Sequence, residues 1–542
     1  MAAQQQTFDY VIVGGGSAGC VLANRLSADP DVSVCLLEAG PSDWNPLIRM
    51  PIGIIGLMWS RMFNWAYYTV PQKHLGGRRM FWPRGKTLGG SSAINAQCYT
   101  RGNAADYDHW AELGNRGWGF AEMLAYFRKS ERCEAGESEY HGVDGAYCVS
   151  APRHVNPLSR AFIEAGVACG YPRNDDFGGA TEEGVGLYSV AQDNGRRCSN
   201  ADAFLHPVAH RENLTVITRA RVRRIRLEGR RAVGVTYRRG RWGGDRTVEA
   251  RREVLLCGGA INSPQLLLLS GIGPREEIEP HGIPLVHELR GVGRNLQDHL
   301  DVSIIDLERT RLSLRLGPRF LFVDLPRAVY QYFVHHRGQL TSNVAEAGGF
   351  ARSGDDRAHA DLQLHFIATV EQDHGHNLWN TIKHHGYTLR VCDLRPKSRG
   401  RIGLTSADPA ADPLIDPNYL DHPDDLAQMV RAVKAGRAIM RAPPLAAHRE
   451  RELEPGETVT DDAAIEAFVR DKAETIYHPV GTCRMGSDAA AVVDDRLRVH
   501  GIQGLRVVDA SIMPTLVGGN TNAPTTAIAE KAADMIREDA EG

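Results

Sequence analysis

Apolar and polar residues alternate in blocks at the start of the chain, and this pattern predicts a strand, a tight turn, a helix and a second strand between residues 8 and 38. The first apolar run covers residues 10–13 and stops at a cluster of glycines. A helical pattern then reaches Leu26, and a second apolar run ends at Glu38. This is the order of elements with which an α/β domain begins.

Four further strand-like runs lie between residues 214 and 257, and the last of them leads into a second glycine turn. After this turn we predict a helix with Ser263 as its N-cap, Pro264 in its first position and Gly271 at its end, because each residue type favours that position. The four predicted strands cover residues 214–218, 222–227, 232–237 and 247–257.

Two segments with a different pattern, residues 156–195 and 301–464, indicate a second lobe. The shorter one combines a helical pattern with polar turns, and the longer one mixes strands with helices. The elements predicted in and after these segments are a helix at 157–168, strands at 362–368 and 387–393, a helix at 425–440, a strand at 505–509 and an amphipathic helix at 525–536.

Gly14, Gly16 and Gly19 form a G-x-G-x-x-G pattern at the first turn. In a Rossmann-like unit the first glycine allows a sharp turn, the second lets the main chain approach a pyrophosphate, and the third lets the helix pack closely on the strand. The free N–H groups of the helix N-terminus then face the phosphates. Glu38 follows at the end of the second strand, where a carboxylate binds ribose hydroxyls. The pattern therefore predicts binding of NAD or FAD rather than NADP.

Two other motifs overlap with these glycine-rich stretches. Residues 15–19 also match the G-x-S-x-G nucleophile elbow of hydrolases, but an elbow at the first strand lacks the preceding sheet and oxyanion loop, so we interpret Ser17 as a phosphate contact. The triplet at residues 85–87 suggests a phosphate loop, yet that motif requires glycine where the chain has Met80. We interpret the pair Gly89 and Gly90 instead as a second close approach to the cofactor.

The chain has 542 residues, enough for two or three domains, and its 63 basic and 66 acidic side chains give a net charge of −3. This balance predicts no general attraction to nucleic acid. The ten cysteines form no C-x-x-C pair and no zinc-like spacing with histidine, so we expect reduced thiols and no metal site. The first residues do not resemble a secretory leader, and no apolar run reaches the ~20 residues of a spanning helix. We therefore expect a cytoplasmic protein.

Two apolar patches and two arginine-rich stretches raise the question of a membrane contact. The patches cover residues 51–59 and 314–333, and the basic stretches cover residues 219–231 and 239–252. We expect the patches to pack in a core or to line a pocket, and the arginines to lie on the exposed faces of strands. A peripheral contact with the inner face of the cell membrane is the minority alternative.

Four separated motifs resemble those of the glucose-methanol-choline oxidoreductases, flavoenzymes that oxidise alcohols with FAD. They are the first glycine pattern, Gly89-Gly90-Ser91-Ser92 with Asn95, residues 259–273, and His478-Pro479-Val480-Gly481-Thr482-Cys483 with Val508-Asp509-Ala510-Ser511. Together they span nearly the whole chain. Within the family, the stretches NWAYYTVPQ, LTSNVAEAGGF and AETIYHPVGTCRMG resemble bacterial membrane-associated aliphatic alcohol dehydrogenases most closely, and choline dehydrogenase is also similar.

The resemblance implies a discontinuous, Rossmann-like FAD-binding domain formed by residues 1–155, 196–300 and 465–542. Residues 156–195 and 301–464 would form an α+β substrate-binding domain with a mostly antiparallel sheet. The flavin ring would lie at the boundary between the two domains.

The resemblance also implies the residues that contact FAD. Val222 would contact adenine through its main chain, and Asn522 would contact the pyrimidine edge of the flavin. Some relatives bind flavin covalently through a histidine, and this chain has Ile94 at that position, so noncovalent FAD is implied. The implied cofactor contacts are Gly14, Gly16, Ser17, Ala18, Gly19, Glu38, Ala39, Arg84, Gly89, Gly90, Asn95, Val222, Asp509, Ala510, Asn520 and Asn522.

His478 and Asn520 are the candidate catalytic residues. The pKa of an alcohol is far above neutrality, so a base must take the hydroxyl proton as hydride leaves carbon, and histidine accepts protons near pH 7. The family carries His or Asn at the second position, and an amide there can orient the substrate oxygen. Asn520 follows two glycines and is also a residue that favours turns.

These residues predict FAD-dependent oxidation of primary aliphatic alcohols of medium or long chain to aldehydes, with electrons passed to quinone or another acceptor that is not O₂. The alternatives are a choline-type dehydrogenase, an alcohol oxidase that uses O₂, and a flavin-dependent lyase or redox-idle flavoprotein. Glu346 in VAEAGGF is the candidate pocket residue that would distinguish a cationic substrate from a neutral alcohol. Its carboxylate either pairs with a cationic substrate or accepts structural hydrogen bonds.

Overall fold

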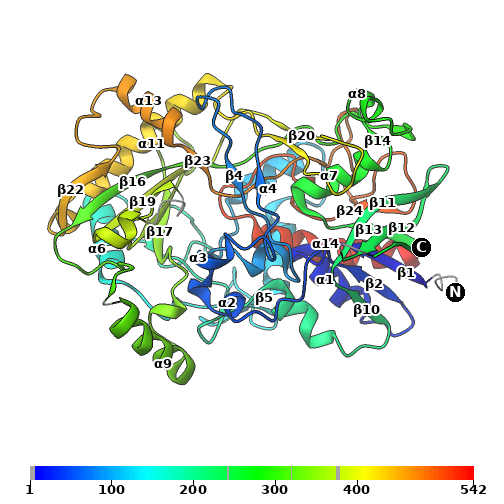
Figure 1. Cartoon of the computed structure of the whole chain (residues 1–542), viewed down its shortest axis with the longest axis horizontal. Helices are drawn as coiled ribbons and strands as arrows, with labels where there is room; N and C mark the ends of the chain where they lie inside the picture. Colours follow the sequence, from blue (N-terminus) through cyan, green and yellow to red (C-terminus); the bar gives the residue numbers. More distant parts are fainter. Residues whose placement is uncertain (1–5, 241–242, 319, 374–378, 542) are drawn as a thin grey trace.

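The computed structural model describes residues 6–240, 243–318, 320–373 and 379–541. Two seven-stranded sheets form its framework. In Figure 1 the first sheet lies to the right with both chain termini beside it, and the second sheet lies to the left. The predicted combination of an α/β unit with a second, mostly antiparallel sheet is confirmed.

The first sheet has the order β10-β2-β1-β13-β12-β11, and β24 pairs with β13 beside β12. Strands β10, β2, β1, β13 and β24 are parallel, whereas β12 and β11 continue the sheet as antiparallel strands. All four strands predicted between residues 214 and 257 are present. The strands are β1 (Gln6–Val13), β2 (Val34–Leu37), β10 (Leu214–Ile217), β11 (Ala220–Glu228), β12 (Arg231–Arg239), β13 (Asp245–Leu256) and β24 (Leu505–Val507).

Helices α1 (Ser17–Leu26) and α14 (Asn522–Glu541) pack against each other beside this sheet. An ion pair of 2.7 Å joins Arg25 to the buried Glu530 across their interface. The end predicted for α1 is confirmed. Helix α14 is longer than predicted because Pro524 lies in its first turn, where no main-chain N–H is needed, so the helix begins at Asn522.

The second sheet has the order β22-β16-β19-β18-β17-β7, with β23 also paired to β16, and every pair in it is antiparallel. Helix α6 (Pro157–Ala168) coincides with its prediction, and the long helix α11 (Pro423–Arg441) packs on β19. The strands are β7 (Gly184–Leu187), β16 (Leu300–Glu308), β17 (Ala347–Ala351), β18 (Leu362–Ile367), β19 (Gly386–Asp393), β22 (Arg449–Glu454) and β23 (Glu474–Thr475).

Helix α7 (Gly259–Leu269) begins earlier than predicted, so Ser263 is not its N-cap and Pro264 lies inside it. Proline cannot donate the hydrogen bond that the Ala260 carbonyl would accept in a regular helix. The Thr482 hydroxyl donates to that carbonyl instead, at 2.6 Å. A side chain distant in the sequence therefore allows the helix to extend past its proline.

The patch at residues 314–333 packs only partly in a core, contrary to the prediction. Residue 319 lies outside the described part of the chain. Helix α9 (Leu325–His335) buries Ala328 and Tyr332 against the segment around Met50, and its opposite face is free. Phe322 is 80% exposed and Phe333 is 64% exposed. Figure 1 shows α9 projecting at the lower edge of the molecule, near α2 (Pro46–Arg49).

The patch at residues 51–59 divides between the interior and the surface. Pro51 and Leu57 are buried, Ile54 and Met58 line the main cavity, and Trp59 is exposed. In the described part of the chain no helix is both long and apolar enough to cross a membrane. The other α-helices of the described residues are α3 (Ile54–Leu57), α4 (Ala104–Glu112), α5 (Phe120–Ser130), α8 (Arg275–Ile278), α10 (Trp379–Lys383), α12 (Pro443–Ala446) and α13 (Asp462–Lys472).

Candidate active site

A cavity of about 370 Å³ lies between the two lobes and is lined by residues of both. It joins the first glycine turn and Glu38 to a second group of polar residues that includes His478 and Asn520. Segments more than 400 residues apart in the sequence therefore line one continuous space.

The N-terminus of α1 opens into this cavity. Its N-cap is Gly16, so no side chain satisfies the first N–H groups, and Ser17 and Ala18 of the first turn line the cavity. A Cβ atom on Gly14 would lie 2.4 Å from the Cys257 carbonyl oxygen, so only glycine fits there. Free N–H groups with the positive end of the helix dipole fit a bound pyrophosphate.

Glu38 directly follows β2 and lines the cavity near the N-terminus of α1. Its carboxylate accepts hydrogen bonds from the main-chain N–H groups of Gly15 at 2.9 Å and Gly40 at 2.7 Å. Burial raises the pKa of Glu38 to about 7, although these two N–H donors and Lys86 favour the charged form. The carboxylate thus holds both sides of the nucleotide turn in place and also faces the cavity.

Most of the cofactor contacts predicted from the sequence line the cavity. Gly19 and Gly89 do not. A Cβ atom on Gly19 would lie 1.9 Å from the Gly14 carbonyl oxygen, so this glycine allows close packing of α1, as its place in the pattern predicts. Gly89 has a φ of 84° and turns the chain behind the cavity. The predicted contacts that line it are Gly14, Gly16, Ser17, Ala18, Glu38, Ala39, Arg84, Gly90, Asn95, Val222, Asp509, Ala510, Asn520 and Asn522.

Two of these lining residues are held by buried polar partners. The Asn95 side-chain oxygen accepts a hydrogen bond from Arg197 at 2.8 Å, and Arg197 is itself buried. The Asp509 carboxylate accepts hydrogen bonds from the Gly259 main chain at 2.8 Å and from the Ser263 hydroxyl at 2.5 Å. No sequence motif pointed to Arg197, which lies in a short strand pair outside the recognised motifs.

His478 lies on a loop whose main chain is tightly held. Tyr477, immediately before it, has a φ of 72°, which is unusual for a bulky residue and indicates local strain. The Asp298 carboxylate accepts a hydrogen bond from the His478 main chain at 2.7 Å, and Arg84 donates to the Tyr477 carbonyl at 2.6 Å. Asp298 also accepts from Thr475 at 2.5 Å. These bonds hold the histidine at the cavity wall.

The side chains of His478 and Asn520 meet at the cavity. The Asn520 Nδ2 lies 3.1 Å from the His478 Nε2. The Asn520 main-chain N–H donates to the Thr100 hydroxyl at 2.8 Å, and that hydroxyl donates to the Asn520 Oδ1 at 3.2 Å. Gln363 donates to the same oxygen at 3.1 Å. The amide nitrogen of Asn520 must therefore face His478.

This orientation determines the protonation of the histidine. Because an amide nitrogen only donates, the His478 Nε2 must accept, so its lone pair faces Asn520 and the cavity. The ring proton is then on Nδ1, which lies 3.0 Å from the Nδ1 of His299. Burial lowers the pKa of His478 well below its ordinary value, and the nearby cations Arg84 and Arg390 act in the same direction. The His478 ring is thus neutral, with its free nitrogen toward the cavity.

Glu346 does not line the cavity. Its carboxylate accepts hydrogen bonds from the Asn156 main chain at 2.6 Å, the Ser159 hydroxyl at 3.0 Å and the Ser342 hydroxyl at 2.6 Å. These donors lie at the start of α6 and on a neighbouring loop. Of the two interpretations of Glu346, the structural acceptor agrees with this geometry, and the pairing with a cationic substrate does not.

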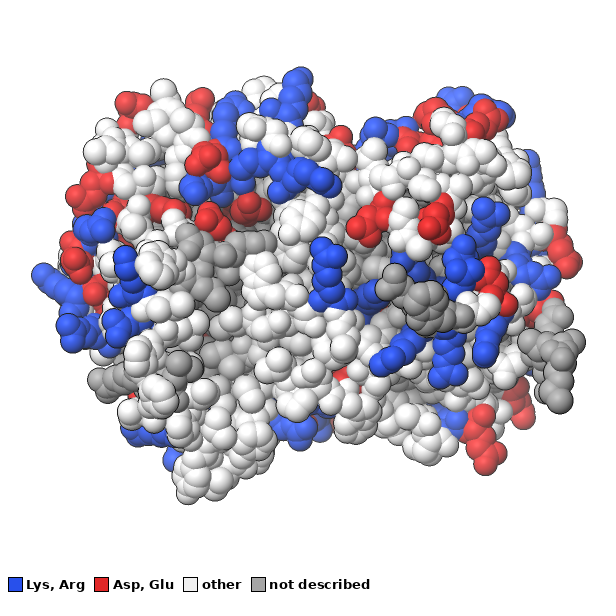
Figure 2. Space-filling model, viewed as in Figure 1, with Lys and Arg blue, Asp and Glu red and all other residues white. Residues whose placement is uncertain are grey.

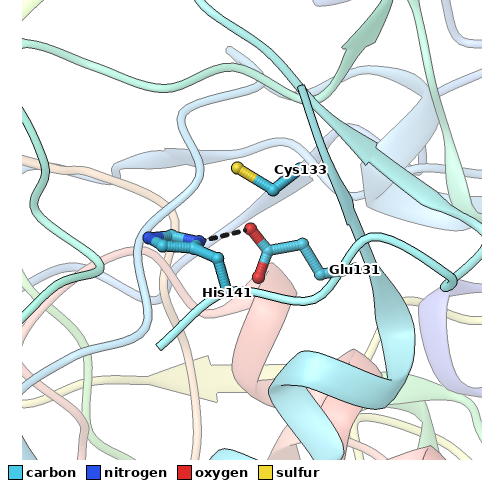
Figure 3. Close-up of side chains that lie close together, drawn as sticks. All are labelled: Glu131, Cys133 and His141. Carbon is cyan, nitrogen blue, oxygen red and sulfur yellow. Dashed lines mark hydrogen bonds and ion pairs between the residues drawn. The ribbon is translucent and has the colours of Figure 1, made fainter. Parts of the chain in front are cut away.

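Two groups of side chains in the described residues have the composition of metal ligands, and neither lines the cavity. Figure 3 shows the first, in which His141 points its Nδ1 at Glu131, 2.7 Å away, with Cys133 beside them. Arg101 also pairs with Glu131, and the other ring nitrogen of His141 lies 3.0 Å from Asp176. These carboxylates raise the pKa of His141 to about 11, so two cations balance two carboxylates.

The second group consists of Asp43, Asp202 and His206. Arg49 forms ion pairs with both carboxylates, and His206 lies 3.0 Å from Asp43. An arginine therefore supplies the positive charge that a metal ion would supply in each group. We interpret both groups as ion-pair networks that stabilise the fold.

Comparison with known proteins agrees with this arrangement. Two family models described as GMC oxidoreductase match residues 8–301 and 396–529. The chain is 52% identical to an alcohol dehydrogenase [acceptor] of Pseudomonas putida, over 98% of this chain and 95% of that protein. It is 46% identical to an oxygen-dependent choline dehydrogenase of Yersinia pseudotuberculosis, over 98% of this chain and 94% of that protein.

Two solved structures are similar over essentially their whole length. The pyridoxine 4-oxidase of Mesorbium loti superposes with a TM-score of 0.87 at 34% identity and covers 99% of both chains. A variant of Aspergillus oryzae formate oxidase, described for its FAD modification, has a TM-score of 0.92 at 28% identity and covers 100% of both chains. These relatives support FAD as the cofactor for which the cavity is built. The chain therefore belongs to the GMC oxidoreductase family.

Proposed function

We propose that this protein is an FAD-dependent dehydrogenase that oxidises primary alcohols of medium or long chain to aldehydes and passes the electrons to quinone or another acceptor that is not O₂. The observation that carries the proposal is the pair of His478 and Asn520 on the wall of a cavity that continues to an uncapped helix N-terminus and Glu38. The similarity to the Pseudomonas putida alcohol dehydrogenase [acceptor] supports the reaction type and the acceptor.

In this proposal His478 and Asn520 act on the substrate hydroxyl. The Asn520 Nδ2 donates a hydrogen bond to the alcohol oxygen, and the His478 Nε2 accepts the hydroxyl proton as the carbon–hydrogen bond breaks. Bound flavin supplies the acceptor for the hydride that leaves the carbinol carbon. The alcohol thus loses one proton and one hydride and becomes an aldehyde.

The chain's own residues favour noncovalent binding of FAD. Covalent attachment needs a nucleophilic side chain, and the position that carries histidine in some relatives is Ile94, which is buried and lines the cavity. Denaturation and filtration of the purified protein should release all of its yellow colour into the filtrate. Colour retained by the polypeptide would contradict this part of the proposal.

The cavity lining favours a neutral, apolar substrate. Ile54 and Ile55 of α3, Met58 directly after it and Ile367 of β18 supply apolar surface, which suits an alkyl chain. Glu371 also lines the cavity and lies 3.8 Å from Arg390, which pairs more closely with Asp301, at 3.0 Å. A choline-type substrate would need a carboxylate or an aromatic cage for its cation, so Glu371 is the residue to which that alternative would assign the cation.

Steady-state assays with an artificial dye acceptor test the substrate class. We expect kcat/KM to rise from ethanol to 1-octanol and to be lowest for choline, because each buried methylene adds about 0.8 kcal/mol of binding free energy. The same assays in air without the dye should give slow turnover. A preference for choline would favour the choline-type alternative, and equal rates with O₂ would favour an oxidase.

We further propose a peripheral contact with the membrane through an apolar face around α9. This face is formed by the exposed side chains of Phe322, Val323, Tyr330, Phe333 and Val334. Figure 2 shows the lower projection of the molecule as a largely uncharged surface. The buried side of α9 packs against the 50–52 segment, and the chain continues from there into α3, which lines the cavity.

The composition of this face suits the interface of a bilayer rather than a protein partner. An aromatic side chain with an apolar body and a polar tip, such as that of Tyr330, is typical of the headgroup region. The exposed cations Arg327, within α9, and Arg337, just after it, would attract anionic lipids. An apolar alcohol or quinone dissolved in the bilayer would then lie close to the α3 side of the cavity.

Flotation with vesicles tests this contact. We expect the holoenzyme to float with vesicles of phosphatidylcholine and phosphatidylglycerol, and the double variant Phe322→Ser, Phe333→Ser to stay in the soluble fraction. Leu113→Ser is the matched control, because Leu113 is also exposed but lies at the end of α4. Equal flotation of all three proteins, or flotation of none, would rule out the α9 face.

A further inference from the structure

His299 lies directly behind His478 and is not part of the cavity wall. The two Nδ1 atoms are 3.0 Å apart, and the rings meet edge to face with centroids 5.2 Å apart at 87°. His299 is fully buried. A hydrogen bond between two ring nitrogens requires that one carries the proton and the other a lone pair.

The direction of this hydrogen bond follows from groups whose roles are unambiguous. The Tyr188 hydroxyl donates to the Leu364 carbonyl at 2.7 Å, so it accepts from Gln363, whose Nε2 must therefore face Tyr188 and Asn520. Together with the Asn520 main-chain N–H, this donor fixes the Asn520 amide and makes the His478 Nε2 an acceptor. The proton on the His478 Nδ1 is consequently donated to the His299 Nδ1.

The relative position of the two histidines is set by strand pairing. His299 immediately precedes β16, and its main-chain carbonyl accepts a hydrogen bond from Ile476 at 3.1 Å. Leu300 of β16 pairs with Thr475 of β23, and His478 follows β23. The adjacent Asp298 binds the His478 main chain. The same short ladder therefore carries the base and its ring partner.

The electrostatic surroundings keep His299 an acceptor. Burial, with Arg395 and His365 nearby, lowers the pKa of His299 to about 3, so its ring is neutral. Arg84 and Arg390 are the other cations that act on His478, and Asp298 is the acidic group bound to its main chain. His299 can thus stabilise a protonated His478 through its lone pair without taking the proton for itself.

We propose that His299 is a positioning residue that accepts the Nδ1 proton of His478 and thereby keeps the Nε2 lone pair directed at the substrate hydroxyl. This inference rests on the proposed role of His478 as the base. Without an acceptor at Nδ1, the imidazole is free to move its proton to Nε2, where it can no longer accept one. The protonated ring formed during the reaction would also lose its hydrogen bond.

Two variants of His299 test the proposal kinetically. His299→Leu removes the acceptor, and we expect kcat to fall about 10- to 100-fold with little change in KM, less than the loss caused by removing an orienting carboxylate. The ascending limb of its pH profile should move to lower pH because the protonated base is less stable. His299→Asn places an oxygen near the lost Nδ1, so it should recover most of kcat and the pH profile.

A measurement without substrate separates this inference from the proposed reaction. In holoenzyme labelled with ¹⁵N-histidine, the His478 ring, assigned by comparison with His478→Gln, should show a protonated Nδ1 and an unprotonated Nε2. The same single state should persist in His299→Asn, and a mixture of the two neutral forms should appear in His299→Leu. Unchanged nitrogen shifts in His299→Leu would overturn the proposal even if every alcohol were oxidised. Failure of the wild-type enzyme to oxidise any alcohol would contradict the proposed function, and the nitrogen shifts would still decide the role of His299.

Discussion

His478 differs from the histidine of a hydrolase triad in the groups that surround it. In a triad a carboxylate orients the ring and raises the stability of its protonated form. Among the described residues no carboxylate pairs with the His478 ring, and its partner at Nδ1 is the neutral ring of His299. Such a site favours the neutral ring, which is the form that the proposed reaction requires.

The pH dependence of catalysis should reflect this environment. As the proposed base, His478 would act in its neutral form, and burial lowers its pKa well below the ordinary value of 6.5. Because the neutral form persists down to the lowered pKa of His478, kcat/KM should stay constant as the pH falls through 6.5. It should decline only when the pH approaches that lowered pKa. A pH series of kcat/KM with 1-octanol checks this. An ascending limb above 6.5 would show that another group acts as the base.

Removal of the base should abolish most of the chemistry and leave the cofactor in place. We expect His478→Ala to lower kcat by a factor of about 10² to 10⁴. The flavin content should match that of the wild type, because the nucleotide turn is far away in the sequence and its hydrogen bonds are intact. His109→Ala is the control, since His109 lies on the exposed surface of α4. Turnover of His478→Ala within a few-fold of the wild type would remove His478 from its proposed role.

At the scale of elements, helix α7 shows how a distant side chain extends a helix past a proline. The Thr482 hydroxyl satisfies the Ala260 carbonyl in the buried interior. Thr482→Val keeps the shape of the side chain but leaves that carbonyl without its donor, which costs about 1 to 3 kcal/mol. We expect a lower melting temperature in calorimetry.

A matched control distinguishes burial from the mere loss of a hydroxyl. Thr405 also donates to a main-chain carbonyl, at 2.6 Å from the Asp412 oxygen, but this bond is exposed to water. Thr405→Val should therefore leave the melting temperature nearly unchanged. Equal effects of both substitutions would contradict the structural role given to Thr482.

The nucleotide turn also depends on a side chain that binds main-chain groups, namely that of Glu38. Its carboxylate bridges the main chain at Gly15 and Gly40 and faces the cavity. Glu38→Ala should purify with less flavin and bind added FAD more weakly, as measured by the ratio of visible to ultraviolet absorbance. Glu228→Ala, at the exposed end of β11, should keep its full flavin content. Full flavin content in Glu38→Ala would show that the turn holds the cofactor without this carboxylate.

The sequence predicts those elements whose boundaries carry local signals. The glycine turn marks the start of α1, and the residue pattern marks α6 from Pro157 to Ala168. The start of α7 was predicted wrongly because its stabilising partner, Thr482, is distant in the sequence. The exposure of α9 was also missed, since apolar content does not reveal which face of a helix finds a partner.

The same limit applies to the candidate site. Family motifs identify His478 and Asn520, and the structure brings their side chains within 3.1 Å. The residues that orient them, Thr100, Gln363 and His299, come from three other segments. The sequence Gln297-Asp298-His299 before a buried strand was an available signal, because polar side chains at the edge of a sheet often serve a site.

At the scale of the whole molecule, each of the two sheets supplies residues to a different part of the cavity. The first sheet, with α1 and α14, presents the nucleotide turn and Asn522. The second sheet supplies Ile367 to the cavity wall and Gln363 as a donor to Asn520, and His478 follows strand β23, which pairs with β16. The cavity between them requires both lobes, so neither lobe alone contains the proposed site.

Anaerobic mixing of the purified holoenzyme with 1-octanol tests the central claim most directly. If His478 and Asn520 activate a primary alcohol beside bound flavin, the yellow absorbance should bleach in the wild type within the turnover time and far more slowly in His478→Ala. Admission of air should then restore the colour slowly, whereas a quinone should restore it rapidly. Flavin that stays oxidised in the wild type with 1-octanol, and with every other primary alcohol tried, would contradict the account.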